Sequence, residues 1–314
     1  EDVYQGLVSA QHTDFTAEFH TAEELIERVL LDLHLSIEIP EGYSEISALQ
    51  FADAPFKELV LKYRDLLYLN NLPPDSIVNH SEALAQRTHL IRAFSDPDEA
   101  VRFVISKVTD IVNRFPRTMS EIQCGRNRGD VLDPYIIAAT QFLLYNGNFE
   151  RAMGGIVAHK ALMMIEDLLG HLHEDVIGRM RGNYRVPEPR GDEQETLDLN
   201  LNPFPGADVI QVPLNQEDKI SFHQIKSKTG SAKGGDGRRL GLQLAQLRQK
   251  YDGDIYYHAL IGNTLRGHRS KTAVEREASD VVVLVGSASF RQLTRTPIGA
   301  DLLLRVYQAA FKEV

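Results

Sequence analysis

Residues 205–239, PGADVIQVPLNQEDKISFHQIKSKTGSAKGGDGRR, decide how the rest of the chain is interpreted. Residues 207–212 and 220–226 are rich in apolar and β-branched side chains, which predicts two short strands separated by a loop. A basic, glycine-rich segment follows and leads into a leucine pattern that predicts a helix over 238–251. The stretch therefore predicts strand, loop, strand and helix in succession.

The two predicted strands carry three residues with a chemical use. Gln224 and Lys226 are two apart, so they project to one face of their strand while Ile225 points to the other. Asp208 begins the neighbouring strand and can lie beside them if the register allows. Hydrolysis of a phosphodiester requires a hard cation with oxygen ligands. Asp208 supplies a carboxylate, Gln224 an amide oxygen, and Lys226 a cation that stabilises charge on the phosphate.

A site with glutamine in place of a second acid is one negative charge short. Glu166, on a predicted helix over 149–173 that precedes the strands, is the candidate for the missing carboxylate. Taken singly, Asp208 is explained as a turn acid after Pro-Gly and Lys226 as a solvated charge at a strand end. Their combination in this order of elements favours the catalytic interpretation.

The first 115 residues are predicted to be mostly helical. Thr21 and Glu24 form a plausible capping box at the start of the first helix. The glycines, prolines and arginines of 116–134 predict a loop, in which Arg126 and Arg128 are either solvated or in contact with DNA. Apolar periodicity and stop signals predict helices over 22–35, 55–70, 81–94, 97–115 and 134–146.

The second half of the chain predicts a mixed sheet. A polar loop over 182–195 precedes the alternating run TLDLNL at 196–201, which predicts the first strand. Later strands are predicted at 255–262 and at 281–286, the latter apolar throughout and hence buried on both faces. The final helix is predicted over 301–314. Three consecutive strands pair as a meander, and the helix after them carries a crossover to a parallel strand.

Charge is distributed unevenly along the 314 residues. Between Lys219 and Arg276 there are twelve Lys and Arg against four acids, a balance of +8, so the remainder of this −10 chain carries −18. Such segregation is typical of a basic cleft in an acidic body. Cys124 is the single cysteine, which excludes an internal disulfide. No apolar run approaches the roughly 18 residues of a membrane span, and we expect a soluble protein of a reducing cytoplasm.

Two basic, glycine-containing loops are candidates for DNA contacts. The first, at 227–239, lacks the Gly-Lys-Ser/Thr of a Walker A motif and the third glycine of a dinucleotide fingerprint, which favours duplex DNA. The second, TLRGHRSKT at 264–272, suits contacts with guanine edges but is equally well explained as a solvated surface loop. A zinc site is rejected because His171 and His173 face different ways on a helix. The candidate residues are Lys228, Lys233, Arg238, Arg239, Arg266, His268, Arg269 and Lys271.

The element order, with Asp208, Gln224 and Lys226, resembles the core of the PD-(D/E)XK nuclease superfamily. The chain length, N-terminal helices and basic loop resemble a type II restriction endonuclease, nearest to the ApaLI-like group. The resemblance covers roughly 149–262. It departs from the common pattern in Gln224, where an acid is usual, and in the spacing of Pro205 from Asp208; some members of the superfamily carry such a glutamine.

The resemblance implies an α/β fold with an αβββαβ restriction-endonuclease-like core, a mixed central sheet and a mostly helical N-terminal region. It implies a helical region at 1–145 that serves dimerisation, DNA contacts or both, and a catalytic domain at 146–314. It further implies Mg²⁺ held by Asp208, Gln224 and Glu166, and a homodimer in a prokaryotic cytoplasm that cuts both strands of a short palindromic DNA site. The alternative is a non-catalytic DNA- or RNA-binding protein in which Gln224 marks a decayed nuclease site.

Overall fold

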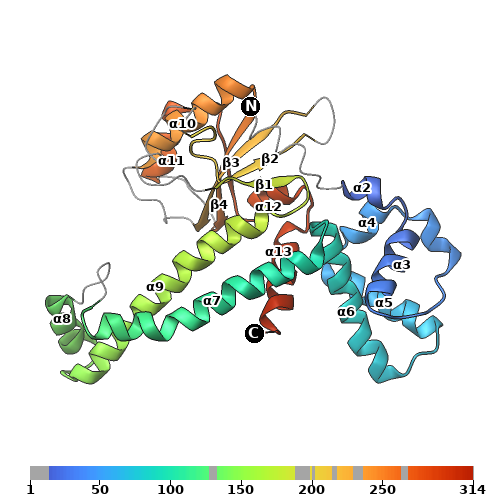
Figure 1. The fold of residues 1–314 in the computed structure, drawn as a ribbon, viewed down its shortest axis with the longest axis horizontal. Coiled ribbons are helices and arrows are strands. Elements are labelled where there is room, and N and C mark those ends of the chain that lie inside the picture. Colours follow the sequence, from blue (N-terminus) through green and yellow to red (C-terminus); the bar gives the residue numbers. More distant parts are fainter. Residues whose placement is uncertain are drawn as a thin grey trace. The chain divides into compact units, whose positions relative to one another are not determined.

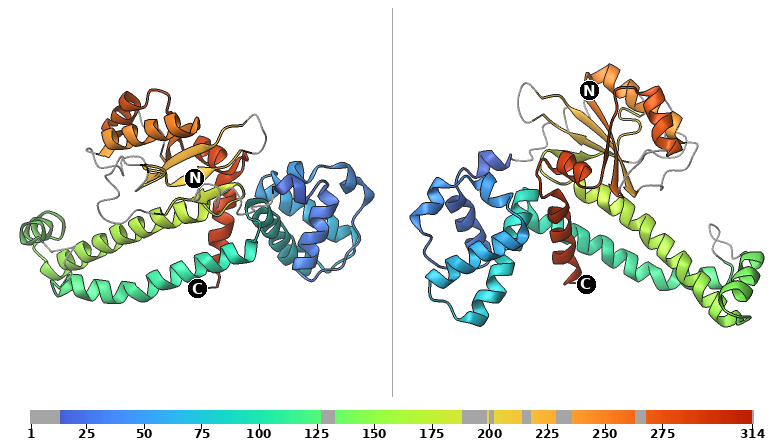
Figure 2. Two further views of the ribbon diagram at one scale, coloured as in Figure 1. Left: turned by 45° about the horizontal axis from the view of Figure 1, so that its top comes forward. Right: turned by 180° about the vertical axis from the view of Figure 1, so that it is seen from behind.

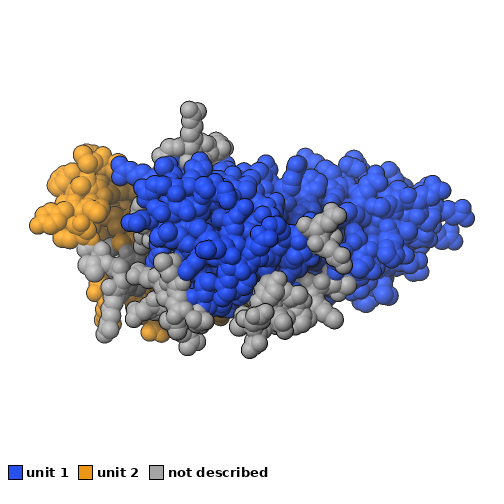
Figure 3. All heavy atoms as spheres, turned by 90° about the horizontal axis from the view of Figure 1, so that it is seen from above, with its two compact units in different colours: residues 1–101, 174–309 blue, residues 102–173, 310–314 orange. Residues whose placement is uncertain are grey.

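A computed structural model describes residues 14–126, 133–187, 199, 202–213, 218–228, 236–262 and 268–313. The chain divides into two compact units, coloured separately in Figure 3. The first unit contains residues 1–101 and 174–309, and the second contains 102–173 and 310–314. The predicted boundary between 1–145 and 146–314 stays a prediction. Among the described residues, no helix is both long and apolar enough to cross a membrane.

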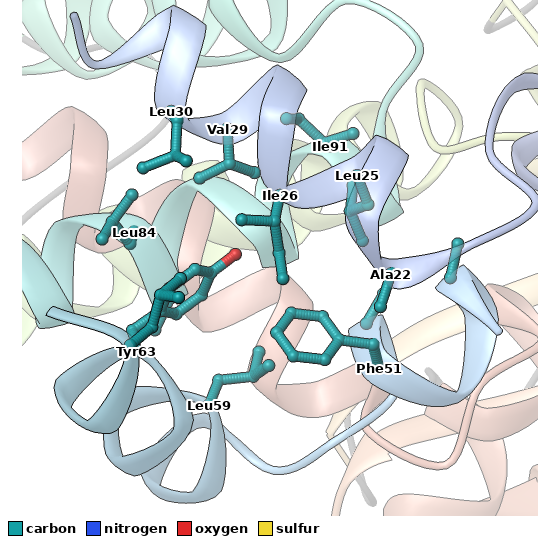
Figure 4. Packing of buried hydrophobic residues seen from close by; sticks show 14 of the residues in the cluster. Ala22, Leu25, Ile26, Val29, Leu30, Phe51, Leu59, Tyr63, Leu84 and Ile91 are labelled. Carbon is teal, nitrogen blue, oxygen red and sulfur yellow. The ribbon is translucent and has the colours of Figure 1, made fainter. Parts of the chain in front are cut away.

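The N-terminal part of the first unit is helical, as predicted. Its core is formed by side chains from several of these helices, including Leu25, Phe51 and Leu59, around the fully buried Tyr63 (Figure 4). The hydroxyl groups of Tyr63 and Thr88 are joined by a hydrogen bond of 2.6 Å. The elements are α2 Phe15–Glu18, α3 Ala22–Asp32, the 3-10 helix η1 Glu41–Glu45, α4 Ala48–Ala52, α5 Phe56–Leu69 and α6 Pro74–Ala93.

Local sequence signals account for where these helices begin. Thr21 and Glu24 form the predicted capping box at α3, with each side chain accepting a hydrogen bond from the other residue's backbone N–H. The helix predicted over 81–94 begins earlier than expected, at Pro74. Proline is tolerated in the first turn of a helix, so Pro74 begins this helix instead of ending the previous segment.

The helix predicted to end at 115 is longer than expected. It is α7, Pro97–Gln123, which contains Pro116 in its interior, so the predicted loop at 116–134 is wrong over 116–123. Proline removes one N–H from the helical ladder, but the helix continues and buries Ile122 beyond it. Arg126 is exposed after the helix, and Arg128 lies outside the described residues. Helices α8, Pro134–Leu144, and α9, Phe149–Ile177, confirm the predicted elements there.

The sheet has five strands in the order β1-β2-β3-β4-β5 (Figure 1). Strands β1 to β3 are antiparallel neighbours, whereas β4 is parallel to β3 and β5 is parallel to β4. The mixed α/β sheet is therefore confirmed. The strands are β1 Asn183–Arg185, β2 Val209–Gln211, β3 Ser221–Lys228, β4 Asp254–Ile261 and β5 Val282–Val285.

Two predictions about the strands are corrected. The first strand, β1, lies at 183–185 within the predicted loop of 182–195, while the strand expected at 196–201 falls outside the described residues except for 199. Strand β5 is paired with β4 alone among the described strands, and Val282 is exposed, so burial on both faces is wrong. An edge strand can expose an apolar run that resembles a central strand in sequence.

The helices after β3 cover the two faces of the sheet. On one face, α10, Asp236–Tyr251, buries Leu244 and Leu247 against a cluster that includes Phe222 and Tyr257. The neighbouring α11, Arg269–Glu277, lies against α10. On the other face, α12, Ser287–Thr294, contacts β4 and donates a hydrogen bond from Ser289 Oγ to the carbonyl oxygen of Ala259. The last helix is α13, Gly299–Phe311.

Candidate active site

Asp208 lies directly before β2 and is bound to β3 through both its backbone and its carboxylate. Val209 pairs with His223 in the antiparallel register, which puts Asp208 opposite Gln224. The backbone N–H of Asp208 donates to the carbonyl oxygen of His223 at 2.8 Å. Asp208 Oδ2 accepts hydrogen bonds from the backbone N–H of Ile225 at 2.6 Å and from the side-chain amide of Gln224. The carboxylate is therefore oriented by the strand that carries the other two candidate residues.

A glycine turn and an arginine hold Asp208 from the opposite side. Gly206 has φ +76°, and a Cβ there would lie 3.1 Å from Cβ of Gln243 on α10, so this close turn favours glycine. The Arg185 guanidinium donates to the carbonyl oxygens of Asp208 at 2.9 Å and Val186 at 2.8 Å. The same guanidinium pairs with Glu174 at 2.6 Å. The position of Asp208 is thus tied to β1 and to the end of α9.

Gln224 and Lys226 share one face of β3, as predicted. This is the face of Phe222, which α10 covers, because alternate residues of a strand point to the same side. Gln224 is buried, and Lys226 is half-buried two residues nearer the end of the strand. No acid of the described chain pairs with the Lys226 ammonium group. The structure therefore brings Asp208, Gln224 and Lys226 to one face of adjoining strands.

A buried histidine pair lies on the opposite face of the same strands. His223 Nδ1 and His258 Nε2 are 2.9 Å apart, and the His223 ring stacks on Tyr256 with centroids 4.9 Å apart. Burial lowers the pKa of His258 to about 3. The pKa of His223 is also well below its usual value, through burial first and then the nearby His258 and Arg295. Both rings are therefore neutral near pH 7. They lie on the face of the sheet opposite to that of Gln224.

The predicted metal ligands are not all in one unit. Asp208 and Gln224 belong to the first unit, whereas Glu166 is an exposed residue of α9 in the second. Whether Glu166 joins Asp208 stays a prediction. Among the described residues, no group of three His, Cys, Asp or Glu side chains is arranged to hold a metal ion.

The candidate DNA-contacting residues gather where β3 and β4 end. Lys228 pairs with Ile261 at the last positions of these parallel strands, so the segments after both strands leave from one edge of the sheet. Arg238 and Arg239 lie in the first turn of α10, and Arg269 and Lys271 in the first turn of α11, which His268 precedes as N-cap. Lys233 and Arg266 lie outside the described residues.

The two helices that carry these residues begin side by side. A Cβ at Gly237 would lie 2.5 Å from the carbonyl oxygen of Ser270, and one at Gly241 would lie 2.8 Å from that of Val274. The helices therefore approach so closely that their N-terminal turns are adjacent. Some of the positive charge is paired within the protein, since Lys271 binds Glu275 at 2.6 Å.

Sequence reasoning missed Arg185 and the His223–His258 pair. Arg185 fell in a segment predicted as a loop, and its partners Glu174 and Asp208 are distant in sequence. The spacing of His223 beside Gln224 offered a signal, since a histidine inside an apolar strand requires a polar partner when it is buried. Its partner, His258, is identified only by the parallel register of β3 and β4.

Comparison with models of known protein families gives no match, and neither does comparison with curated protein sequences.

Proposed function

We propose that this protein is a magnesium-dependent endonuclease of the type II restriction class that hydrolyses phosphodiester bonds in double-stranded DNA. The observation that carries the proposal is the placement of Asp208 opposite Gln224, with Lys226 two residues further along the same face of β3. An acid on one strand and an amide and a lysine on the next are the elements of a PD-(D/E)XK site.

The order of elements supports the same class. Helix α9 precedes the antiparallel strands β1, β2 and β3, and α10 then crosses over to the parallel strand β4. This succession is the αβββαβ order of the PD-(D/E)XK core. The proposed superfamily thus accounts for the mixed sheet and for the position of the candidate residues within it.

The chain offers oxygen ligands suited to Mg²⁺. Magnesium is commonly held by one or two carboxylates together with substrate phosphates. Asp208 supplies a carboxylate, and Gln224, which donates an amide N–H to that carboxylate, has an amide oxygen to offer as a second ligand. Glu166 is the proposed third. Bound there, the cation would neutralise the scissile phosphate and activate water.

Lys226 is assigned the role of stabilising charge on the phosphate. The residue is half-buried on the face of β3 that carries Gln224, and its ammonium group lacks an acidic partner within the described chain. A partly desolvated cation stabilises developing negative charge more strongly than one in bulk water does. The Asp208 carboxylate, oriented by Ile225, is held ready to bind without rearrangement.

The DNA contacts are proposed from the edge where β3 and β4 end. Lys228, Arg238, Arg239 and Arg269 lie beside the adjacent N-terminal turns of α10 and α11, and helix N-termini favour phosphate. Lys233, Arg266, His268 and Lys271 complete the proposed set. Cutting both strands of a short palindrome requires two copies of the chain, and we place the protein in a prokaryotic cytoplasm.

One observation favours a second candidate, a DNA-binding protein without catalysis. The Asp208 carboxylate is already bound by two N–H donors of β3, and no group of three His, Cys, Asp or Glu side chains among the described residues is arranged to hold a metal ion. Such an arrangement is compatible with a decayed site that retains the fold and the basic edge.

Incubation with plasmid DNA and Mg²⁺ separates the two candidates. Discrete fragments support the nuclease, and retarded but intact DNA supports the binding protein. Lys226→Ala should slow cleavage on the order of 10²-fold or more while DNA affinity changes only a few-fold. Lys219→Ala is the matched control, because Lys219 precedes the same strand and pairs with Asp252 at 2.8 Å. A Lys226→Ala protein that cuts at the normal rate would contradict the assignment.

A further inference from the structure

Among the described helices, α8 alone combines the lack of a charged residue with the lack of a buried one. Its sequence, PYIIAATQFLL, is apolar around most of its circumference. A helix that is apolar all round is normally covered on several sides in the working protein. The described chain leaves α8 exposed. Its apolar side chains therefore have no protein surface packed over them within the described residues.

The exposed helix is held in a defined position by its neighbours. Asp133 caps its start by accepting from the backbone N–H of Tyr135 at 2.8 Å. At its end, Gln141 donates to the carbonyl oxygen of Gly147 at 2.6 Å. Tyr145 then packs so close to Gly155 of α9 that a Cβ there would lie 2.5 Å from the tyrosine hydroxyl. Figure 2 shows α8 at the tip where α7 and α9 meet. The apolar surface is therefore a fixed feature of this tip.

The area of this surface fits a protein interface. The most exposed side chains include Tyr135 at 84% and Leu143 at 81%. At about 150–250 Å² for each large side chain, the set presents roughly 600–1,000 Å², whereas a stable interface buries roughly 800 Å² on each partner. The patch also exceeds the roughly 300–600 Å² that is usual for a monomer. The set is Tyr135, Ile136, Phe142, Leu143, Leu144 and Phe149.

The described part of the second unit buries little apolar surface. Over the described part of 102–173, the buried apolar side chains are few, and two of them are alanines. Burial on this scale does not offset the conformational entropy of ordering so many residues. A partner surface would bury further apolar side chains of this unit. The buried residues are Val104, Ile122, Ala152, Ala161 and Leu172.

We propose that the partner is a second copy of this chain, paired through α8 and Phe149 about a two-fold axis. An eleven-residue helix is about 16 Å long, too short for a bilayer of about 30 Å. Its lack of charge gives no basis for binding a nucleic acid or a charged peptide. The same lack of charge makes the surface complementary to itself, as a two-fold interface requires.

A single tryptophan tests what covers α8. The chain has no tryptophan, so Phe142→Trp introduces a single tryptophan in the patch, whose emission can be excited separately from that of the tyrosines. The proposal expects emission that shifts to shorter wavelength as protein concentration rises, together with a sedimentation mass near twice 35.3 kDa. A blue-shifted emission that does not change with concentration, in a monomer, would show that the same chain covers α8. Red-shifted emission at every concentration would show that nothing does. Either result overturns the proposal.

Leu143→Lys supplies the second test, with Leu31→Lys as its matched control. Both leucines are exposed, at 81% and 70%, but Leu31 lies on α3 in the first unit. We expect Leu143→Lys to weaken dimerisation at least tenfold with an unchanged circular dichroism spectrum, and Leu31→Lys to have no effect. Equal dimerisation by both variants counts against the α8 interface. The proposed nuclease also needs two copies of the chain, but none of these measurements involves DNA, so failure of the α8 interface is distinguished from failure of cleavage by the plasmid assay.

Discussion

Ile225 donates its backbone N–H to the carboxylate of Asp208 at 2.6 Å, across the pair formed by β2 and β3. A main-chain donor cannot be removed by side-chain replacement, so it holds this carboxylate in one orientation whatever occupies position 225. Gln224 donates to the same oxygen. The chemistry proposed for Asp208 therefore separates into an oriented oxygen, which an amide can mimic, and a negative charge, which it cannot.

Asp208→Asn should retain the fold and lose DNA cleavage. Asparagine keeps an oxygen that accepts from Ile225, but it removes the charge that binds a cation. We expect the cleavage rate to fall on the order of 10²-fold or more and the melting temperature to change little. Plasmid cleavage at saturating Mg²⁺ measures the first and calorimetry the second. Asp252→Asn, at an exposed acid, should cut at the normal rate; equal loss in both variants would count against a site at Asp208.

Gly241→Ala should destabilise the protein, because the added methyl would meet α11. The new Cβ would lie 2.8 Å from both the Val274 carbonyl oxygen and the Cβ of Glu277. Overpacking of this kind costs about 1–3 kcal/mol of unfolding free energy, measurable by urea denaturation. Gly42→Ala is the control, since no atom lies within 4 Å of its Cβ position. If the two variants are equally stable, the close crossing of α10 and α11 is wrong.

Arg185→Met should lower stability more than Arg179→Met does. Arg185 is largely buried and serves two carbonyl oxygens and the carboxylates of Glu174 and Asp175. Its loss leaves buried acceptors without a donor, which lowers the free energy of unfolding by about 3–5 kcal/mol. Arg179 makes a more exposed pair with Glu99 at 3.0 Å, worth at most about 1 kcal/mol. Urea denaturation of both variants provides the comparison, and the prediction fails if their losses are similar.

Stability should fall in acid because of the His223–His258 pair. Burial lowers both folded-state pKa values, that of His258 to about 3, so the unfolded chain binds more protons once the pH drops below its ordinary histidine pKa of about 6.5. The stabilisation is complete above that pH and is lost as the pH falls toward 3. Each histidine therefore makes the free energy of unfolding fall as the pH decreases through this window.

The double variant His223→Gln, His258→Gln checks the assignment. Glutamine does not titrate, so the free energy of unfolding should fall less steeply between about pH 6 and pH 4 in the double variant than in the unmodified protein. The slope is compared, since the substitution itself changes stability at neutral pH. An unaltered slope would show that other groups set the acid sensitivity.

The elements that sequence predicted well are those with local signals. Thr21 with Glu24, and Asp133 before Pro134, mark helix starts through bonds made within a few residues. Alternating and apolar runs identified β2, β3 and β4, and the spacing of Gln224 and Lys226 correctly predicted that they share a face. The proximity of Asp208 to Gln224 depends on the register of β2 and β3. The lengths of these two strands made that register plausible.

The failures involve contacts between distant residues. Strand β1 is three residues long and is identified by pairing with β2, which no local pattern announces. Pro116 predicts a helix end, because proline disfavours a helix interior. The apolar face of α7 nevertheless continues beyond it. Arg185 acquires its role from Asp208 and Glu174, and His223 from His258. Sequence alone cannot place Glu166 relative to Asp208 either, since the two belong to different units.

The parallel pairing of Lys228 with Ile261 has a consequence for how such a protein can evolve. Both connections that follow these strands depart from a single rim, while Asp208 and Gln224 are held within the sheet by backbone bonds. In the proposed nuclease, insertions and substitutions in those connections would alter which DNA sequence is bound without disturbing the proposed catalytic groups. A scaffold of this kind can change its selectivity over many generations and still conserve its chemistry.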